Sequence, residues 1–246
     1  MDDILFSGLP VADVFYAFRE STLPGKAIVI ILFAGSIIAW SIMITKAVEL
    51  RRATRASTRF LAEFRRESHP IGLYLKRRSF TGSPLYLIYE QGCLAIGHEL
   101  DLRGVETEEL FMGAVGSPDG RLNRVQIESV SNLSDRNVAD QSLLLENNMG
   151  LLATAVSSAP FLGLLGTVWG VMDGFGGMAR EGAANLSAVA PGISAALLTT
   201  VVGLLVALPS AIGYNLLTNQ IRSLTVMMDN FAQEFDSAIR RNYYRE

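Results

Sequence analysis

Two long apolar stretches constrain this chain more than any other feature of its sequence. One runs from Met149 to Met172 and the other from Ala188 to Tyr214, and neither contains a charged side chain. About 20 residues of helix cross the hydrocarbon core of a bilayer, so each stretch is long enough to span a membrane. Both also contain glycines and hydroxyl groups where a simple membrane anchor needs only large apolar side chains.

A third uncharged run, residues 27–45, lies between Lys26 and Lys46. Hydrophobic residues make up 50% of the chain and charged residues only 18%, below the roughly 25% that is typical of soluble proteins. We therefore predict an all-α integral membrane protein with three transmembrane helices, at residues 27–45, 149–172 and 188–214, extended into a helical bundle outside the membrane.

The basic residues predict the orientation of these spans. Residues 46–148 hold fourteen Lys and Arg and the tail 215–246 holds four, whereas the loop 173–187 holds only Arg180 and the segment 1–26 holds two. Because loops rich in Lys and Arg stay on the cytoplasmic side, the N-terminus is predicted to lie outside and the C-terminus inside. The 46–148 domain and the amphipathic tail helix are then cytoplasmic, and the 173–187 loop is periplasmic.

Three further helices are predicted outside the spans. In the N-terminal segment 1–26, apolar residues at helical spacing over Val11–Glu20 indicate an amphipathic helix on the periplasmic side or at the membrane interface; the alternative is a loose tail. Ser83 followed by Pro84 is a typical N-cap and first helical position. From Arg121 the helical spacing continues without a proline until Pro160, so we predict one long helix that rises into the second span.

The second and third spans each present a stripe of small residues on one helical face. Such residues let helices approach closely in lipid, where packing drives association. Helix packing is therefore the simplest interpretation of the glycines, alanines and proline in both stripes. These residues are Pro160, Gly163, Gly166 and Gly170 in the second span, and Ala196, Gly203 and Ala207 in the third.

Thr167 and Thr200 stand out because each is a hydroxyl on such a stripe. A threonine in a membrane helix can simply bond the carbonyl group four residues earlier in its own helix. Alternatively, the two hydroxyls face water or the acid of a partner. The three runs contain no Asp, Glu, Lys, Arg or His, and proton transport normally needs such a group at depth. A titrating carboxylate would therefore have to come from another polypeptide.

Other functions find little support in the sequence. The net charge of −3 argues against general binding of nucleic acid. The single cysteine, Cys93, excludes an internal disulfide and a cysteine metal cluster. His69 and His98 lack metal-ligand spacing, and no hydrolase, metalloprotease or phosphate-binding motif is present. We therefore expect neither an enzyme nor a bound cofactor or metal.

Two runs are similar to motifs of the MotA/TolQ/ExbB proton-channel family. Residues Pro160–Met172, PFLGLLGTVWGVM, resemble the family's P-[FY]-[IL]-G-L-x-G-T-V-W-G-[IV]-M. Residues Val189–Leu204, VAPGISAALLTTVVGL, resemble V-A-P-G-I-x-E-A-L-x-x-T-x-x-G-L. One departure matters, because the glutamate of the second motif falls at Ala195 in this chain. The tail, from Tyr214 to Arg241, resembles the TolQ branch of the family more than the ExbB branch.

The resemblance implies a pentamer in the bacterial inner membrane that encloses the single transmembrane helices of a TolR- or ExbD-like partner. The aspartate of that partner would carry the proton, and the family's channel threonines fall on Thr167 and Thr200. With Ala195 in place of the glutamate, either that acid is dispensable in this branch, or the proton path relies on these threonines, Ser194, water and the partner's aspartate.

Proton flow in this family is implied to drive work on the cell envelope through a TolA- or TonB-like transducer. A TolQ-like motor subunit is the function that we predict. The alternatives are an ExbB-like subunit that energises TonB-dependent uptake and a structural membrane scaffold that conducts no protons. A four-span stator of the MotA type is disfavoured, because the sequence contains only three candidate spans.

Overall fold

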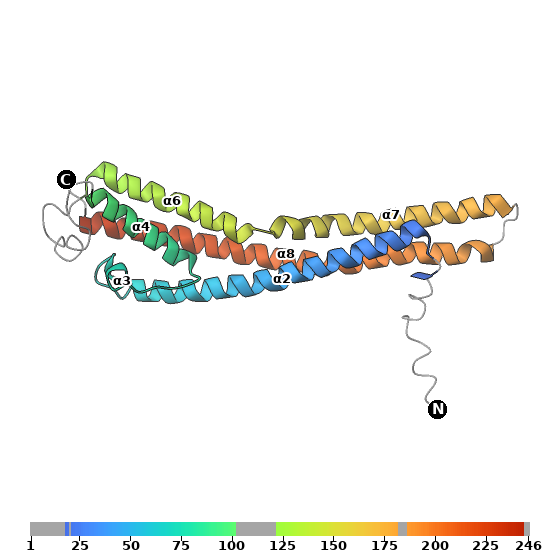
Figure 1. Cartoon of the computed structure of the whole chain (residues 1–246), viewed down its shortest axis with the longest axis horizontal. Helices are drawn as coiled ribbons and strands as arrows, with labels where there is room; N and C mark the ends of the chain where they lie inside the picture. Colours follow the sequence, from blue (N-terminus) through green and yellow to red (C-terminus); the bar gives the residue numbers. More distant parts are fainter. Residues whose placement is uncertain (1–17, 20, 102–121, 182–185, 244–246) are drawn as a thin grey trace, which may run out of the picture. The chain divides into compact units, whose positions relative to one another are not determined.

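The computed structural model describes residues 18–19, 21–101, 122–181 and 186–243. The regular elements in this part of the chain are all helices (Figure 1). They are α2 (Leu23–Phe64), α3 (Gly72–Leu75), α4 (Pro84–Asp101), α6 (Arg124–Glu146), α7 (Met149–Glu181) and α8 (Leu186–Tyr243). The helix predicted over Val11–Glu20 lies outside the described residues, apart from residues 18 and 19.

Three of the described helices are long and apolar enough to cross a membrane, and they contain the three predicted spans. Two of them are longer than expected. Helix α7 continues to Glu181 and α8 begins at Leu186, so the connection between them is shorter than the predicted loop 173–187. Helix α8 also continues without a break from the third span into the amphipathic tail.

The prediction of one helix from Arg121 through the second span is wrong. Helix α6 ends at Glu146 and α7 begins at Met149. Between them Asn148 has a φ of 66°, in the left-handed region that ends a right-handed helix. Asparagine tolerates this region better than most residues, so the chain turns here without a glycine or proline.

Side chains cap the starts of α4 and α6. Helix α4 begins at Pro84, and the Ser83 hydroxyl accepts a hydrogen bond from the backbone N–H of Tyr86 (3.2 Å), which confirms the predicted N-cap. At the start of α6, Asn123 and Gln126 form a reciprocal capping box.

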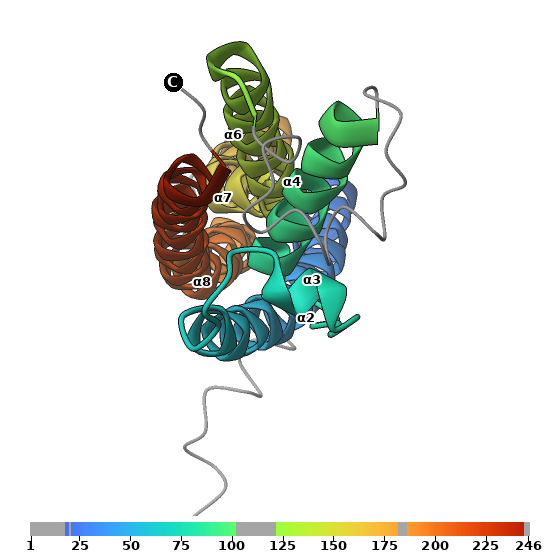
Figure 2. The ribbon, with the colours of Figure 1, turned by 90° about the vertical axis from the view of Figure 1, so that its left-hand side faces the viewer.

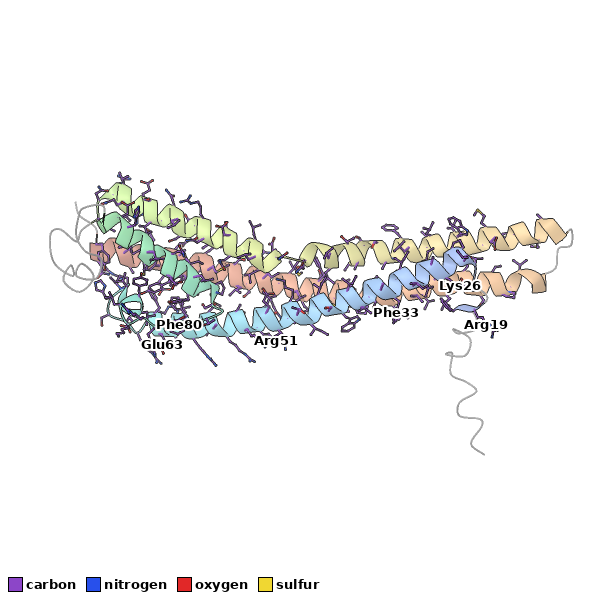
Figure 3. All side chains as sticks on the ribbon, in the orientation of Figure 1. Arg19, Lys26, Phe33, Arg51, Glu63 and Phe80 are labelled. Atoms are coloured by element: carbon purple, nitrogen blue, oxygen red, sulfur yellow. The ribbon has the colours of Figure 1, made fainter. Side chains whose placement is uncertain are left out.

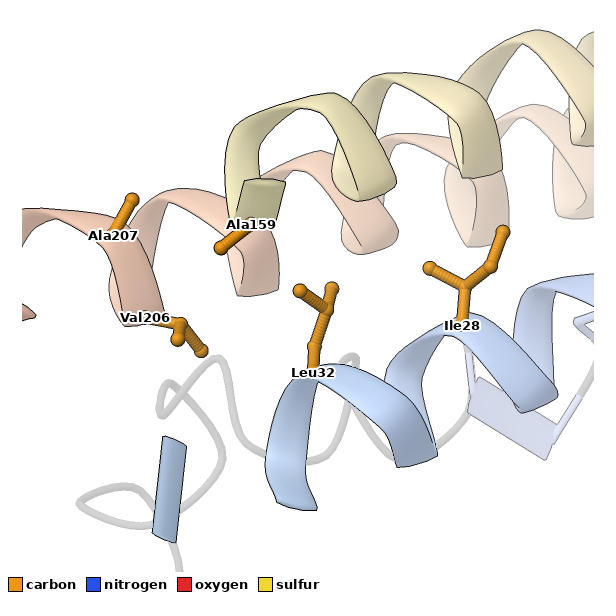
Figure 4. Close-up of a cluster of buried hydrophobic side chains, with 5 residues drawn as sticks. All are labelled: Ile28, Leu32, Ala159, Val206 and Ala207. Carbon is orange, nitrogen blue, oxygen red and sulfur yellow. The ribbon is translucent and has the colours of Figure 1, made fainter. Parts of the chain in front are cut away.

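The chain divides into two compact units. The apolar unit consists of Met1–Thr45 and Asn148–Leu216, and the charged unit of Lys46–Asn147 and Leu217–Glu246. In the apolar unit, α2, α7 and α8 enclose a small cluster of buried side chains (Figure 4). Its members are Ile28 and Leu32 from α2, Ala159 from α7, and Val206 and Ala207 from α8.

Aromatic rings form the core of the charged unit, where α2, α4, α6 and α8 run beside one another (Figure 2). Phe60 is fully buried, and its ring lies within 6.0 Å, centroid to centroid, of five other rings. Those rings belong to Phe64, Phe80, Tyr86, Tyr89 and Phe231. Nearby, burial raises the pKa of the Cys93 thiol, so this free cysteine stays protonated and behaves as a small apolar residue.

Candidate functional site

Helices α7 and α8 cross at van der Waals distance in the apolar unit. A Cβ added to Gly163 would lie 2.9 Å from the carbonyl oxygen of Thr199 and 3.0 Å from the Cα of Thr200. A Cβ on Gly203 would lie 2.6 Å from a carbonyl oxygen of α7. These neighbours are backbone atoms that cannot rotate away, so the observed spacing of the two helices requires glycine at both positions.

The same crossing continues toward the other end of α7. A Cβ on Gly166 would lie 2.3 Å from the hydroxyl oxygen of Thr199, and one on Gly170 would lie 2.6 Å from the Cβ of Ala196. The predicted small-residue stripes of the two spans therefore face each other within a single chain. This contact brings their polar groups together as well.

The remaining predicted residues lie beside the crossing. Ala207 is buried in the cluster of Figure 4, and Pro160 is half-buried inside α7, which continues through it. Ser194 is exposed near the start of α8, whereas Ala195, at the position of the family's glutamate, is buried. The structure therefore does not bring Ser194 into contact with the threonine pair.

Thr167 and Thr200, from separate spans, form a direct hydrogen bond through their hydroxyl groups. The Thr167 hydroxyl also lies 3.2 Å from the carbonyl oxygens of Gly163 and Ala196, and the Thr200 hydroxyl lies 3.1 Å from that of Gly163. Both threonines are half-buried in the chain. The pair is therefore held by backbone carbonyl groups on two helices and keeps part of its surface open.

The sequence analysis missed the role of Thr199, which is buried beneath the pair. Its hydroxyl lies 3.0 Å from the carbonyl oxygen of Gly163 and 2.7 Å from that of Ala196. Adjacent helical residues point about 100° apart, so Thr199 and Thr200 cannot both face the same surroundings. The Thr199 side chain occupies the space that a side chain at position 166 would take. The glycine at 166 was therefore the sequence signal that could have indicated a buried residue opposite it.

The chemistry of this site is limited to hydrogen bonding. The predicted spans, within the part of the chain that the structure describes, carry no acidic or basic side chain beside the pair. The described residues also contain no cluster of three His, Cys, Asp or Glu side chains that could hold a metal ion. Hydroxyls at this point can orient water and solvate a carboxyl group, but they cannot store a proton themselves.

The geometry is compatible with both interpretations of the threonines, helix packing and channel lining. The bond from Thr167 to Gly163 spans four residues of one helix, as a packing role predicts. The bond between Thr167 and Thr200 joins two helices, and a partly open hydroxyl pair is what a channel lining requires. A channel role for Thr167, Thr200 and Ser194 therefore stays a prediction.

Three long apolar helices with close glycine contacts define a polytopic α-helical membrane protein. Comparison with known families goes further, because residues 106–230 match the MotA/TolQ/ExbB proton channel family. The chain belongs to this family, which confirms the resemblance predicted from the two motifs.

Relatives with curated names include both branches that were predicted. The Tol-Pal system protein TolQ of Haemophilus influenzae is 29% identical over 92% of this chain and 93% of that protein. The biopolymer transport protein ExbB of Pseudomonas putida is 34% identical over 83% of this chain but 56% of its own length. ExbB of Salmonella typhimurium is 30% identical, covering 90% of this chain and 84% of that protein.

Proposed function

We propose that this chain is the channel subunit of a proton-driven motor in the bacterial inner membrane, and that its role is TolQ-like. Membership of a proton channel family and three helices of spanning length support the channel part of this proposal. The match to TolQ over nearly the whole of both chains, together with the resemblance of the tail, favours TolQ over ExbB. An ExbB-like role in TonB-dependent uptake is the second candidate, supported by the ExbB relatives.

The observation that carries the proposal is a hydroxyl pair in spans that have no titratable group. A charged carboxylate costs several kcal/mol at the centre of a bilayer. Thr167 and Thr200, with water on their open side, would lower this cost for a carboxyl group placed beside them. A single-span TolR- or ExbD-like partner would supply that group and would pass its proton along the pair, with Ser194 nearer the end of the span.

The proposed oligomer follows from the need to place a partner's carboxyl group beside the hydroxyl pair. Several copies of the chain, five in the family pattern, would surround the partner's helices and present one hydroxyl pair each. Residues 46–148 and the tail would lie in the cytoplasm, and a TolA- or TonB-like transducer would carry the work to the outer membrane. Ala195 leaves this chain without the family's glutamate, so the partner's acid would be the only titrating group beside the pair.

The test replaces both hydroxyls by a methyl group of similar size. The double variant Thr167→Val, Thr200→Val should reduce proton flux, measured with a pH-sensitive dye in liposomes that contain the complex purified with its native partner. Loss of two hydrogen bonds worth about 1 kcal/mol each predicts a reduction of roughly tenfold or more.

Two controls separate the hydroxyl chemistry from packing. Thr167→Ser with Thr200→Ser keeps both hydroxyls and should keep most of the flux. Thr154→Val removes an exposed hydroxyl of α7 that bonds only the carbonyl oxygen of Gly150, and should leave the flux unchanged. Normal flux in the double valine variant would favour the non-conducting scaffold instead.

A further inference from the structure

Helix α2 carries a row of arginines that form no ion pair with the described residues of the charged unit. Arg51, Arg52 and Arg55 are exposed, on the side of α2 opposite its buried residues, and Arg51 is labelled in Figure 3. Within the described part of the chain these three guanidinium groups have no ion pair, whereas Arg65 pairs with Glu234 and Arg78 with Glu63. We call Arg51, Arg52 and Arg55 the basic face.

Helix α6 carries a surface of the opposite character at its C-terminal end. A shallow pocket of about 480 Å³ is lined by Asp140, Leu143, Leu144, Glu146 and Asn147. Leu143 is 67% exposed and Leu144 is 59% exposed, although α6 has its own buried face. The carbonyl groups that end the helix add negative partial charge to the two carboxylates. We call this surface the acidic pocket.

Neither Asp140 nor Glu146 forms an ion pair with another described residue. Arg136 is exposed one turn before Asp140 on α6, further from the helix end. It has no ion pair with Asp140 among the described residues. Two carboxylates, the helix end and two exposed leucines therefore form a surface that is suited to a basic partner with an aliphatic stem.

The basic face and the acidic pocket cannot meet within one chain. Within the charged unit α2 and α6 lie on opposite sides, with α4 and α8 between them (Figures 1 and 2). They do lie at the same level, however, because both adjoin the boundary of the unit at residues 45–46 and 147–148. At 1.5 Å per residue, Arg51 and Arg55 stand roughly 8 and 14 Å from this boundary, and Leu143 and Asp140 roughly 6 and 11 Å.

We propose that the basic face of one copy docks on the acidic pocket of the next copy. Arg55 would pair with Asp140 and Arg51 or Arg52 with Glu146, while the arginine stems would cover Leu143 and Leu144. Opposite faces at one level make a head-to-tail contact, which closes into a ring when the rotation per copy allows it. The inference rests on the proposed function only in requiring that the chain works as a homo-oligomer.

An anionic membrane surface is the other candidate for the basic face. The headgroup layer adds only about 5–8 Å beyond the hydrocarbon core. If the first span ends at Thr45 as predicted, Arg51 stands at the edge of that layer and Arg55 lies beyond it, so lipid headgroups would cover only part of the basic face. A lipid would also leave the acidic pocket and its leucines uncovered, whereas a second copy satisfies both surfaces at once.

The test is a charge exchange in the full-length chain in native membranes, read by chemical cross-linking and by native mass after extraction. Arg55→Glu and Asp140→Arg should each reduce the cross-linked oligomer at least about fivefold, because each brings like charges together. The double variant Arg55→Glu, Asp140→Arg restores opposite charges and should recover the oligomer. Arg124→Glu reverses an exposed charge at the start of α6, roughly 24 Å along the helix from Asp140, and Asp140→Arg should not rescue any defect that it causes.

A cysteine pair keeps the proposal testable if the charge variants fold poorly. Arg52→Cys and Leu143→Cys, expressed in separate copies, should form an intermolecular disulfide on mild oxidation. The proposal is overturned if the double charge variant is no better than the singles and this disulfide does not form. It is equally overturned if the Arg55→Glu defect follows the anionic lipid content of vesicles and is not rescued by Asp140→Arg. These readouts do not depend on proton flux, so the channel proposal can fail while the contact stands, and the reverse.

Discussion

At the scale of single residues, the neighbouring threonines 199 and 200 have different surroundings at the crossing of α7 and α8. Thr199 is buried and bonds backbone carbonyl groups on both helices, which holds the crossing together. Thr200 is half-buried, and its hydroxyl forms a hydrogen bond with the hydroxyl of Thr167. The glycines opposite them remove the side chains that would otherwise keep the two backbones apart. Stability and the proposed channel chemistry therefore depend on different hydroxyls of the same turn.

The close crossing predicts that a methyl group added at one of its glycines lowers the stability of the fold. Gly203→Ala places a methyl group 2.6 Å from a backbone carbonyl oxygen, so we expect a net destabilisation of about 1–2 kcal/mol. The loss should appear as a lower midpoint of thermal unfolding in detergent. Gly150→Ala is the matched control, since a Cβ there has no neighbour within 4 Å and alanine favours helix. Equal midpoints for the two variants would contradict the close crossing.

At the scale of elements, helices α2 and α8 each continue from a predicted span into the charged unit, whereas α6 and α7 are separate. The difference comes from two residues, because α2 and α8 run on without a break, while Asn147 has a ψ of 137° and Asn148 a φ of 66° between α6 and α7. The break also ends α6 at the acidic pocket, which is lined by residues of its last two turns. The helix break thus places the end of α6 at the proposed docking surface.

The left-handed conformation at Asn148 can be tested by substitution. Asn148→Gly should be neutral or mildly stabilising, because glycine adopts a positive φ without strain. Asn148→Val should cost about 1–2 kcal/mol, since a β-branched side chain clashes with the backbone in this region. Hydrogen exchange of the amides at the end of α6 would measure the effect locally. Equal protection in the valine and glycine variants would mean that the turn is not left-handed in solution.

At the scale of the whole molecule, the chain has two cores of different chemistry. The apolar unit packs aliphatic side chains and glycines, which suit a lipid environment where the burial of apolar surface contributes little to helix association. The charged unit packs large aromatic rings, which suit water because burying them releases much apolar surface. We therefore expect a substitution in the core of one unit to destabilise that unit and not the other.

A core substitution in the charged unit tests this separation. Phe60→Ala removes the ring that contacts five others and should destabilise the charged unit by about 3–5 kcal/mol. Limited proteolysis of the membrane-embedded protein should then cut the charged unit faster, while fragments of the apolar unit stay protected. Leu87→Ala, at a side chain that is 43% exposed, is the control and should change little. Faster cleavage within the spans would show that the two cores unfold together.

Much of this architecture can be predicted from the sequence, because its main signals are local. A charge-free run of spanning length shows as such in the linear chain, and so do the family motifs at Pro160–Met172 and Val189–Leu204. The stripes that carry Thr167 and Thr200 follow from helical periodicity alone. The number of spans, the helical class and the family therefore needed no coordinates.

Other features were decided only by the tertiary structure. The helix break depends on the backbone conformations of Asn147 and Asn148, and neither of these residues is a glycine or proline. Which of two adjacent threonines is buried depends on the rotation of α8 against α7, which a single helix cannot specify. The aromatic core around Phe60 and the opposed faces of α2 and α6 join residues far apart in the chain. Such features arise from packing between helices, and local periodicity carries no information about which helices meet.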